Sequence, residues 1–600
     1  MKYILKISLF LSFFIGKTIF CQSNEQLAKK LFQDKDYLKA AIIYEDLVSE
    51  FSENPEYYEN YLTCLIQTQN QGKAISFLRK KSKKNSFPLP FMIDECWIHA
   101  SHKEGQKEFQ KLTSTIISKV KSDYLLSLQA AKLFSKRNLK SEAIEILQNI
   151  EENFGESQEV SNEIALLYIE NGQRFQALER YIEMMTRSNI RYDQLKQIFD
   201  TYITDSADII NLQQLLLVKI QQYPQVTALS EWLKWTFIQT QDWEKALIYS
   251  KSLDKRLREN GIRVFELGNI CFSNKSYSVA LRCFEYCLNK GEISHDLSSV
   301  KSNYLQTEFE LLKLSYKDSV NWQSFNYKLI QYIAEYGISN NSFKIAELAA
   351  FNYLQNLNRI DSAIILLETY VEADYLNKRT IANAKIALAN TLLVGGDVWK
   401  SELLFAQVEK EFKDDILGQK AKFSRAEISF YRGNYEWANM QLDVLKDATT
   451  QLISNDAMEL SLCITDNLGI DSNYLALDYY AKSTLFQKQL LFDSALFYLE
   501  KLAAEFPGHS LGDELLFSKA KIAEKKGDVK RSIELYKIII DAYSNDILAD
   551  NAIYELAQIY QYKEKNTGLA LEMYKKLIDN HSNSIYIVEA RKEFRKLRGF

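Results

Sequence analysis

The sequence predicts an all-α fold, an α-solenoid of about twelve stacked helical hairpins that forms a right-handed superhelix. Small residues recur 34 positions apart, in the pairs Ala40 and Ala74, Ala143 and Ala177, and Ala246 and Ala280. A fixed period of this length, with a small residue where two helices approach closely, is typical of stacked helix pairs. The 600 residues also include only 5 Pro and 19 Gly, which leaves little material for β-turns or flexible linkers.

Each marker residue lies in one apolar skeleton that spans two expected helices. Around Ala280 the skeleton reads Leu267-Gly268-x2-Cys271 and then Ala280-x3-Phe284-x2-Cys287. Around Ala177 it reads Ile164-Ala165-x2-Tyr168, a turn at Asn171-Gly172, and then Ala177-x3-Tyr181-x2-Met184. This skeleton resembles the tetratricopeptide repeat (TPR). The resemblance implies a helix pair in every repeat, with the first helix of each pair on a concave face that meets a partner.

The repeats continue to the end of the chain with a longer step. Markers that are mostly 37 or 38 positions apart are Ala363, Ser401, Ala438, Ala495, Ser532 and Ala570. The best copies turn at Gly433-Asn434-Tyr435 and Gly527-Asp528, and one connector reads Phe506-Pro507-Gly508-His509-Ser510. Between Leu475 and Ser584 this pattern resembles the TPR branch that includes the periplasmic coordinator of the Tol–Pal system and the repeat lipoprotein of the outer-membrane β-barrel assembly machinery.

The spacing of the markers divides the chain into segments. We expect a signal peptide at 1–21, an N-terminal repeat array at 22–292, an irregular helical connector at 293–341 and a C-terminal array at 342–600. A helical insert is expected near 446–473, because the interval between markers there does not divide into whole repeats. The intervals from Ala74 to Ala143 and from Ala177 to Ala246 each fit two periods plus one residue, so each is expected to hold one degenerate repeat.

The first 21 residues predict export to the periplasm. Met1-Lys2-Tyr3 carries positive charge, residues 4–20 are mostly apolar, and Gln22-Ser23-Asn24-Glu25 is polar, which is the layout of a secretory signal peptide. Cleavage after Cys21 would leave Gln22 as the new terminus. Two alternatives stay open. A lipid anchor at Cys21 is disfavoured by Phe20, because the bacterial lipobox has a small residue there, and a retained membrane anchor is disfavoured by Lys17.

Charge argues against a nucleic-acid partner. Without residues 1–21 the chain has 71 basic residues and 78 acidic ones, a net charge of about −7, whereas nucleic-acid-binding domains are usually basic. Two local basic runs remain, Arg79-Lys80-Lys81-Ser82-Lys83-Lys84 and the tail at 591–598. We interpret both as solvated helix faces, with contact to an anionic envelope surface or an acidic partner as the alternative.

No motif predicts an enzyme, a cofactor or a small-molecule substrate. The chain lacks a G-x-S-x-G elbow, a Walker loop and an H-E-x-x-H pair. Cys271, Cys283 and Cys287 occupy packing positions, with a bridge from Cys271 to one of the other two as the alternative. A metal site is not expected at Cys96, His99 and His102 either, because residues three apart on a helix bring at most two side chains to one metal.

Partner-binding residues are expected on the first helices of the last two good repeats. They occupy non-core positions and mix aromatic, amide and charged groups: Glu514, Phe517, Lys521, Glu524, Asn551, Tyr554, Gln558 and Gln561. Such a mix suits a peptide or an extended protein segment, although ordinary solvated helix surface is the alternative for any one residue. The Lys and Asn carboxylate clamp of TPR co-chaperones is not reproduced, so recognition of a C-terminal carboxylate is not predicted.

Two functions fit this pattern. The first is a non-catalytic periplasmic scaffold that mediates protein–protein interactions in a cell-envelope complex, with peripheral association to the outer membrane through a partner. The second is a chaperone-like carrier that binds extended exported polypeptides in its concave groove. A scaffold is expected to form a stable stoichiometric complex, whereas a carrier is expected to bind heterogeneous and weak clients.

Overall fold

Helices are the only regular elements in the part of the chain that the structure describes. The computed structural model describes residues 24–187, 195–196, 199, 203, 206–290, 296–314, 321–446, 451–468 and 474–598. No strand occurs in these ranges, which confirms the predicted all-α fold class. Within them, no helix combines the length and the apolar character needed to cross a bilayer. The predicted signal peptide, 1–21, lies outside the described residues.

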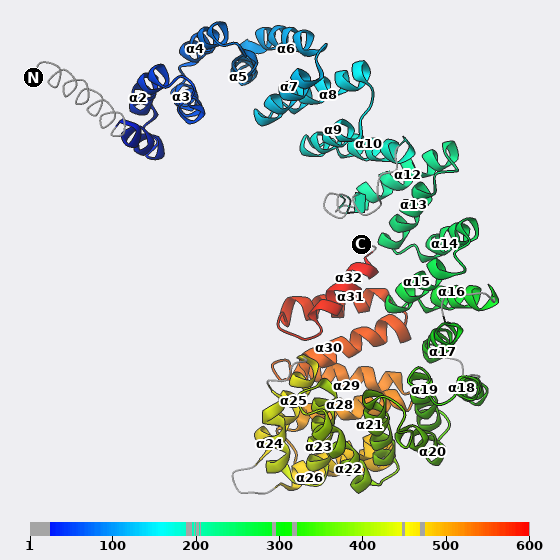
Figure 1. Cartoon of the computed structure of the whole chain (residues 1–600). Coiled ribbons are helices and arrows are strands. Elements are labelled where there is room, and N and C mark those ends of the chain that lie inside the picture. Colours follow the sequence, from blue (N-terminus) through cyan, green and yellow to red (C-terminus); the bar gives the residue numbers. More distant parts are fainter. Residues whose placement is uncertain are drawn as a thin grey trace, which may run out of the picture. The chain divides into compact units, whose positions relative to one another are not determined.

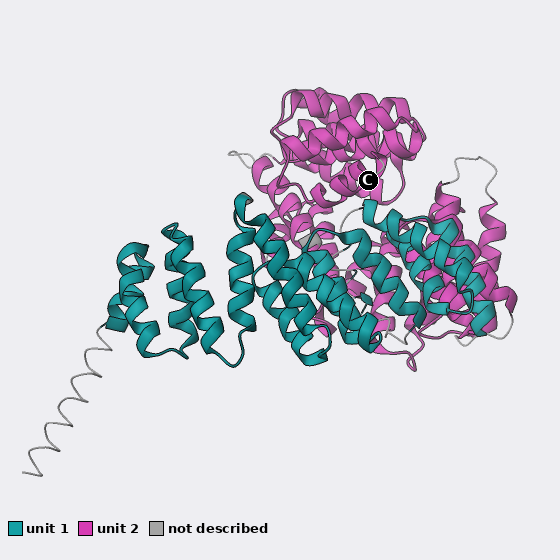
Figure 2. Cartoon of the chain, turned by 90° about the horizontal axis from the view of Figure 1, so that it is seen from above, with its two compact units in different colours: residues 1–258 teal, residues 259–600 magenta. Residues whose placement is uncertain are grey.

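The chain divides into two compact units, Met1–Arg258 (unit 1) and Glu259–Phe600 (unit 2), coloured separately in Figure 2. This division falls before the connector expected at 293–341. Two helices occupy that interval, α17 (Leu297–Leu314) and α18 (Trp322–Tyr336). Helix α17 packs against α16 and α19, and α18 packs against α19, so the described part of this interval continues the helix stack.

Unit 1 is a succession of helices in which each packs mainly against its neighbours in sequence (Figure 1). It begins with a helix at 24–33, and the helices that follow are α2 (Tyr37–Glu50), α3 (Pro55–Gln67), α4 (Gln71–Lys84), α5 (Leu89–Ala100), α6 (Gln106–Val120), α7 (Tyr124–Lys136), α8 (Lys140–Phe154), α9 (Gln158–Glu170), α10 (Arg174–Arg187), α12 (Ser206–Gln222), α13 (Thr227–Gln239) and α14 (Trp243–Leu257). Neighbour-to-neighbour packing of this kind buries apolar surface without a single large core.

Unit 2 continues in the same way. Besides α17 and α18 it contains α15 (Ile262–Ser273), α16 (Tyr277–Lys290), α19 (Phe343–Gln355), α20 (Ile360–Val371), α21 (Lys378–Val394), α22 (Val398–Glu411), α23 (Ile416–Tyr431), α24 (Tyr435–Leu445), α25 (Gln451–Asn467), α26 (Leu475–Lys488), α27 (Phe492–Glu505), α28 (Gly512–Lys525), α29 (Val529–Ala542), α30 (Ala549–Gln558), α31 (Thr567–Asn580) and α32 (Ile587–Leu597). A π-helical turn, Ile559–Lys563, extends α30.

The marker residues lie at the helix contacts that the repeat pattern predicts. Ala40, Ala74, Ala143, Ala246 and Ala280 are completely buried. At Gly268, on the helix that faces Ala280, an added Cβ atom would lie 2.7 Å from Cε1 of Phe284 and 3.0 Å from Cβ of Cys283. Helices α15 and α16 therefore approach too closely for a larger residue, and the predicted register is confirmed at this hairpin.

The Gly-Asp turns follow from backbone geometry. Gly527 has a φ of +83°, a left-handed conformation that glycine adopts without steric cost. The side chain of the next residue, Asp528, accepts a hydrogen bond of 3.0 Å from the backbone N–H of Arg531 and caps α29. Gly396-Asp397 repeats the arrangement before α22. The turn thus ends one helix and starts the next within two residues.

The insert expected near 446–473 contains one described helix, α25. It packs against α24 and α23, while α23 also contacts α26 directly. Figure 1 shows α25 next to α24. Helix α25 is therefore an extra helix added to the stack rather than a member of a regular pair.

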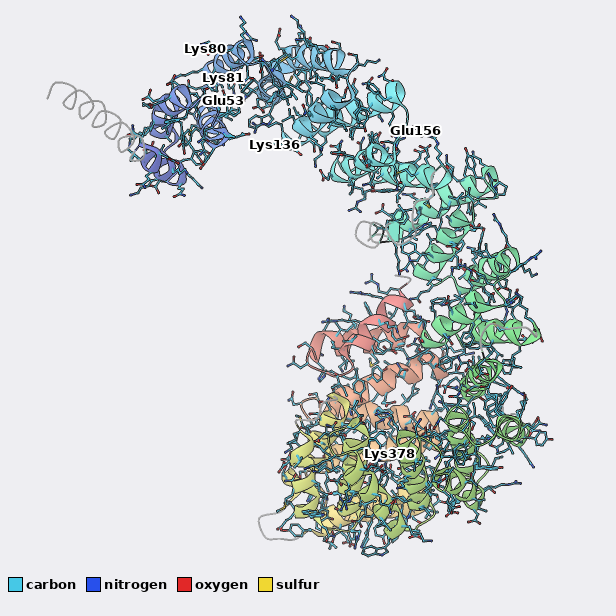
Figure 3. The ribbon with its side chains drawn as sticks, in the orientation of Figure 1. Glu53, Lys80, Lys81, Lys136, Glu156 and Lys378 are labelled. Atoms are coloured by element: carbon cyan, nitrogen blue, oxygen red, sulfur yellow. The ribbon has the colours of Figure 1, made fainter. Side chains whose placement is uncertain are left out.

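An ion-pair cluster joins α3, α5 and the end of α7 in unit 1. Arg137 donates from Nη2 to Glu59 over 2.8 Å and from Nε to Asp94 over 2.5 Å. Its guanidinium lies 4.8 Å from the centre of the Trp97 ring. Lys136, labelled in Figure 3, contacts the same Glu59 at 2.9 Å. Burial alone would raise the pKa of Glu59, but the hydrogen bonds from Lys136 and Arg137 lower it below its ordinary value.

Unit 2 also has a contact between its first hairpin and its last helix. Lys275, in the turn between α15 and α16, lies 3.0 Å from Glu589 on α32, although the two residues are 314 positions apart. The hydrogen bond that Lys275 donates to Glu589 raises the pKa of Lys275 above its ordinary value. In Figure 1 the red α32 lies next to α15. The stack of unit 2 thus returns to its own beginning.

Candidate partner-binding surface

The eight candidate residues lie on the first helices of two neighbouring repeats. The α28 residues are Glu514, Phe517, Lys521 and Glu524; α30 carries Asn551, Tyr554 and Gln558; Gln561 lies in the π-helical turn after α30. All eight are half-buried. Two ion pairs join these elements, Lys521 to Glu555 at 2.5 Å and Lys563 to Glu524 at 3.0 Å. The structure brings the expected face together, and its side chains already contact one another.

On α28 the aromatic and charged candidates form one packed group. The rings of Phe517 and Tyr536 meet edge to face with centres 5.6 Å apart, and Nζ of Lys521 lies 5.6 Å from the centre of the Phe517 ring. The Tyr536 hydroxyl donates to Glu524 over 2.7 Å. Burial, followed by the charge of Glu524, raises the pKa of Tyr536 well above its ordinary value. Glu524 is therefore held by its own chain rather than solvated.

The candidates on and after α30 are engaged by the C-terminal helix. Gln561 donates to Glu593 of α32 over 2.5 Å, and the Glu593 side chain is almost completely buried. Tyr574 bridges two of the candidates, accepting from Gln558 at 2.6 Å and donating to Gln561 at 2.5 Å. The ring of Tyr554 stacks on Tyr586, just before α32, with centres 4.4 Å apart. This end of the predicted face is an internal polar network.

Glu514 differs from the other candidates because it opens into a cavity of about 520 Å³. The cavity lies between α23, α25, α26 and α28, and the residues just before α30 complete it. Its aromatic wall includes Phe430, which is 1% exposed, Tyr431, which is 7% exposed, and Tyr480. The rings of Phe430 and Tyr480 are 6.4 Å apart. A preformed cavity of this size is within the range of ligand pockets, about 300–1,000 Å³.

The same cavity is strongly acidic. Five carboxylic acids line it, namely Glu427, Asp456, Glu459, Asp466 and Glu514, and the one basic residue in its wall is Lys488. Lys488 lies 3.1 Å from Glu427 and is thereby already paired. The Oε2 atom of Glu514 is inaccessible to solvent and has no hydrogen-bond partner among the described residues.

Desolvation and the charges of neighbouring acids raise the pKa values of three of these acids, Asp456, Glu459 and Glu514. Burial, then the hydrogen bond and charge of the adjacent Asp513, raises the pKa of Glu514 to about 9. Glu459 is solvent-exposed at the cavity, but the protein around it limits its hydration, and this desolvation, with the charges of Asp456 and Asp550, raises its pKa to about 7. Burial likewise raises the pKa of Asp456. The ionised form of these carboxyl groups is therefore destabilised, and a cation bound among them would stabilise it.

Other candidate groups are used by the fold itself. In the basic run, Arg79 lies 2.7 Å from Glu95 and Lys81 donates to the carbonyl of Ser52 over 3.1 Å, whereas Lys80 is exposed (Figure 3). The six cysteines after the predicted signal peptide are all buried. Burial raises the pKa of the Cys64 thiol to about 11, which makes it a poor nucleophile at neutral pH. No group of His, Cys, Asp or Glu suited to a metal ion occurs in the described ranges.

The last complete helix pair consists of α30 and α31. Its marker, Ala570, is completely buried against the preceding helix of the pair. Residues 551–584 match the tetratricopeptide repeat family model. This match covers the TPR helix pair predicted around Ala570. No curated protein matches the chain.

Solved structures of similar extent have low overall agreement with this chain. The "Structure of Naa15/Naa10 bound to HypK-THB" is 14% identical, with 96% of each chain covered and a TM-score of 0.28. The "Crystal structure of APC/C hetero-tetramer Cut9-Hcn1" is 12% identical, with 97% of this chain and 98% of that chain covered and a TM-score of 0.24. The "Human IFIT1 dimer with m7Gppp-AAAA" is 15% identical, with coverages of 73% and 80% and a TM-score of 0.25. Agreement at this level carries no argument about function.

The repeat period locates the helix pairs but gives no sign of the acidic cavity, because most of the charge of the cavity comes from α25. Asp456, Glu459, Cys463 and Asp466 lie within about 80° of arc on an ideal helix, so they share one face. That acidic face was the available signal. The sequence does not show that this face lines a cavity, since the repeat period does not determine the direction of an added helix.

Proposed function

We propose that this chain is a non-catalytic TPR scaffold that mediates protein–protein interactions in a complex of the bacterial cell envelope. The observation that carries the proposal is the family match at 551–584 within a stack of helix pairs whose marker residues are buried. Stacked repeats of this kind present extended surfaces suited to other polypeptides. The connectors between Leu475 and Ser584, which resemble those of the periplasmic Tol–Pal coordinator branch, favour the envelope over other settings.

Affinity purification of the chain, tagged at its C-terminus and extracted in mild detergent, tests the scaffold. We expect one or a few envelope proteins to co-purify in fixed stoichiometry by mass spectrometry, some of them linking the complex peripherally to the outer membrane. A set of unrelated proteins at low and variable occupancy would contradict the scaffold. It would support the second candidate, a carrier for extended exported polypeptides, which the acidic cavity favours because it could hold a single side chain of many clients.

Export follows from the same proposal and is testable by itself. We expect the mature protein to begin at Gln22 and to appear in the periplasmic fraction, because residues 1–21 have the layout of a signal peptide. Terminal sequencing or intact-mass measurement checks the cleavage site. A diacylated Cys21 would instead make the protein a lipoprotein, and an intact Met1 would make it membrane-anchored.

A further inference from the structure

We propose that the cavity between α23, α25, α26 and α28 is a recognition pocket for an arginine side chain on a basic segment of a partner protein. The inference rests on the proposed function, since it names the chemistry of the partner that the scaffold would hold. Three properties of the cavity carry it: unbalanced negative charge, an aromatic wall and sufficient volume.

The charge of the pocket is not balanced by its own chain. Of the acids that line it, Glu427 is paired with Lys488, while Asp456, Glu459 and Glu514 form no ion pair among the described residues. These carboxyl groups come from two helices, with Asp456 and Glu459 on α25 and Glu514 on α28. Separate carboxylates partly withdrawn from water are stabilised by a cation that reaches more than one of them. A positively charged occupant therefore fits the pocket better than a neutral or acidic one.

The aromatic wall favours a guanidinium over a simple ammonium. Phe430, Tyr431 and Tyr480 line the cavity beside the acids. A guanidinium is planar, stacks on aromatic rings and offers five N–H donors in fixed directions, so it can serve carboxylates on different helices at once. A lysine ammonium is a compact, strongly hydrated charge that loses more on leaving water.

The size of the pocket favours a side chain carried by a polypeptide over a bare ion. A cavity of about 520 Å³ exceeds what a metal ion requires, and no group suited to a metal ion is found in the described residues. An exposed apolar residue lies in its wall, since Ile547 lines the cavity and is 48% exposed. Such a residue can contact the apolar neighbours of an arginine in an extended segment.

Fluorescence anisotropy with the mature full-length chain tests the pocket. The probe is a fluorescein-labelled peptide, Gly-Ser-Leu-Arg-Ser-Leu-Arg-Ser-Gly, compared with counterparts in which both arginines are replaced by citrulline or by lysine. Citrulline keeps the shape of arginine without its charge. We expect the citrulline peptide to bind at least about tenfold more weakly, and the lysine peptide to fall between the two.

Variants of the protein locate the binding. Glu514→Gln and Glu459→Gln keep the shape of the side chain, and at pH 9, where Glu459 is ionised and Glu514 is losing its proton, each should weaken binding of the arginine peptide by about tenfold or more. The control is Glu411→Gln, the same change at an exposed residue on α22 outside the pocket, which should leave the affinity unchanged. Equal binding by the pocket variants and the parent chain would overturn the proposal, and so would equal binding of the citrulline peptide. Equal binding of the lysine peptide would overturn the assignment to arginine.

The pH dependence supplies an independent readout. Desolvation by the surrounding protein raises the pKa of Glu459 to about 7 and that of Glu514 to about 9, so between pH 6 and pH 9 Glu459 loses its proton and Glu514 begins to lose its own. Arginine stays charged throughout, and its affinity should therefore rise over this range. The charged groups around these two acids are Glu427, Asp456, Asp466, Lys488, Asp513, Asp546 and Asp550. A constant affinity from pH 6 to pH 9 would contradict a role for Glu459 and Glu514.

The scaffold and the arginine pocket can be tested independently of each other. A stoichiometric complex that persists in the Glu514→Gln variant, together with no binding of the arginine peptide, would remove the pocket proposal and leave the scaffold. Peptide binding that depends on Glu514 and Glu459, without any stoichiometric partner in the purification, would keep the pocket and replace the scaffold by the carrier.

Discussion

Replacement of Arg137 by Ala is expected to destabilise the helices around it in unit 1 by about 3–5 kcal/mol. The side chain of Arg137 is mostly buried and is shared by Glu59 and Asp94. Asp94 is 5% exposed, so removal of the guanidinium leaves a carboxylate in the protein without its cation. Such an unpaired buried charge costs far more than the loss of a surface ion pair. The Trp97 ring also loses the guanidinium packed over it.

Hydrogen exchange measured by mass spectrometry on peptides from α3, α5 and α7 checks this expectation, because it reports local opening in a chain with two units. We expect exchange to accelerate about a hundredfold or more in these helices. Lys136→Ala is the matched control. Lys136 contacts the same Glu59 but is largely exposed, so its removal should cost no more than about 1 kcal/mol. Comparable effects of the two substitutions would show that burial does not determine the strength of this cluster.

Replacement of Ala280 by Trp is expected to disrupt the α15–α16 hairpin by about 1–3 kcal/mol or more. Ala280 is completely buried, and the contact between the two helices is so close that even a Cβ atom at Gly268 would overlap Phe284. Because stacked repeats are stabilised by their neighbours, the damage should spread first to the adjacent hairpins. Limited proteolysis should then cut first between residues 250 and 300.

Ser278→Trp provides the control for this substitution. Ser278 is an exposed residue on the same helix, so it receives the same side chain without overlap in the core. We expect its proteolysis pattern to match that of the parent chain, since exposed substitutions usually stay within about 0.5 kcal/mol. If Ala280→Trp resisted protease as well as Ser278→Trp, the register of this repeat would be wrong.

The repeat period predicts those parts of the fold that recur. The contact at Ala280 and the turn at Gly527-Asp528 could be placed from sequence, because a close helix contact requires a small residue and a left-handed turn favours glycine. Helix α25 could be expected as an insert but not oriented. Its direction depends on packing against α23 and α24, which no local pattern encodes.

The contacts of single side chains on the candidate surface could not be predicted from sequence either. The spacing predicts which positions of α28 lie outside the core, but not what meets them. Glu524 accepts a hydrogen bond from Tyr536 and pairs with Lys563, so Glu524→Ala is not the neutral change expected of a solvated residue. Glu514 opens into the acidic pocket only because α25 lies opposite. The partner-binding role of all eight residues stays a prediction.

The contact between Lys275 and Glu589 changes how unit 2 can lose its structure. In a stack of repeats that makes no contact between its two ends, the repeats at each end can unfold locally. In unit 2 the last helix, α32, is joined to the first hairpin by this ion pair. The pair is partly exposed and contributes no more than about 1 kcal/mol. The attraction between the two charges is strongest at low ionic strength and is weakened by salt, which screens it. Local unfolding at the two ends of unit 2 is therefore expected to increase with ionic strength.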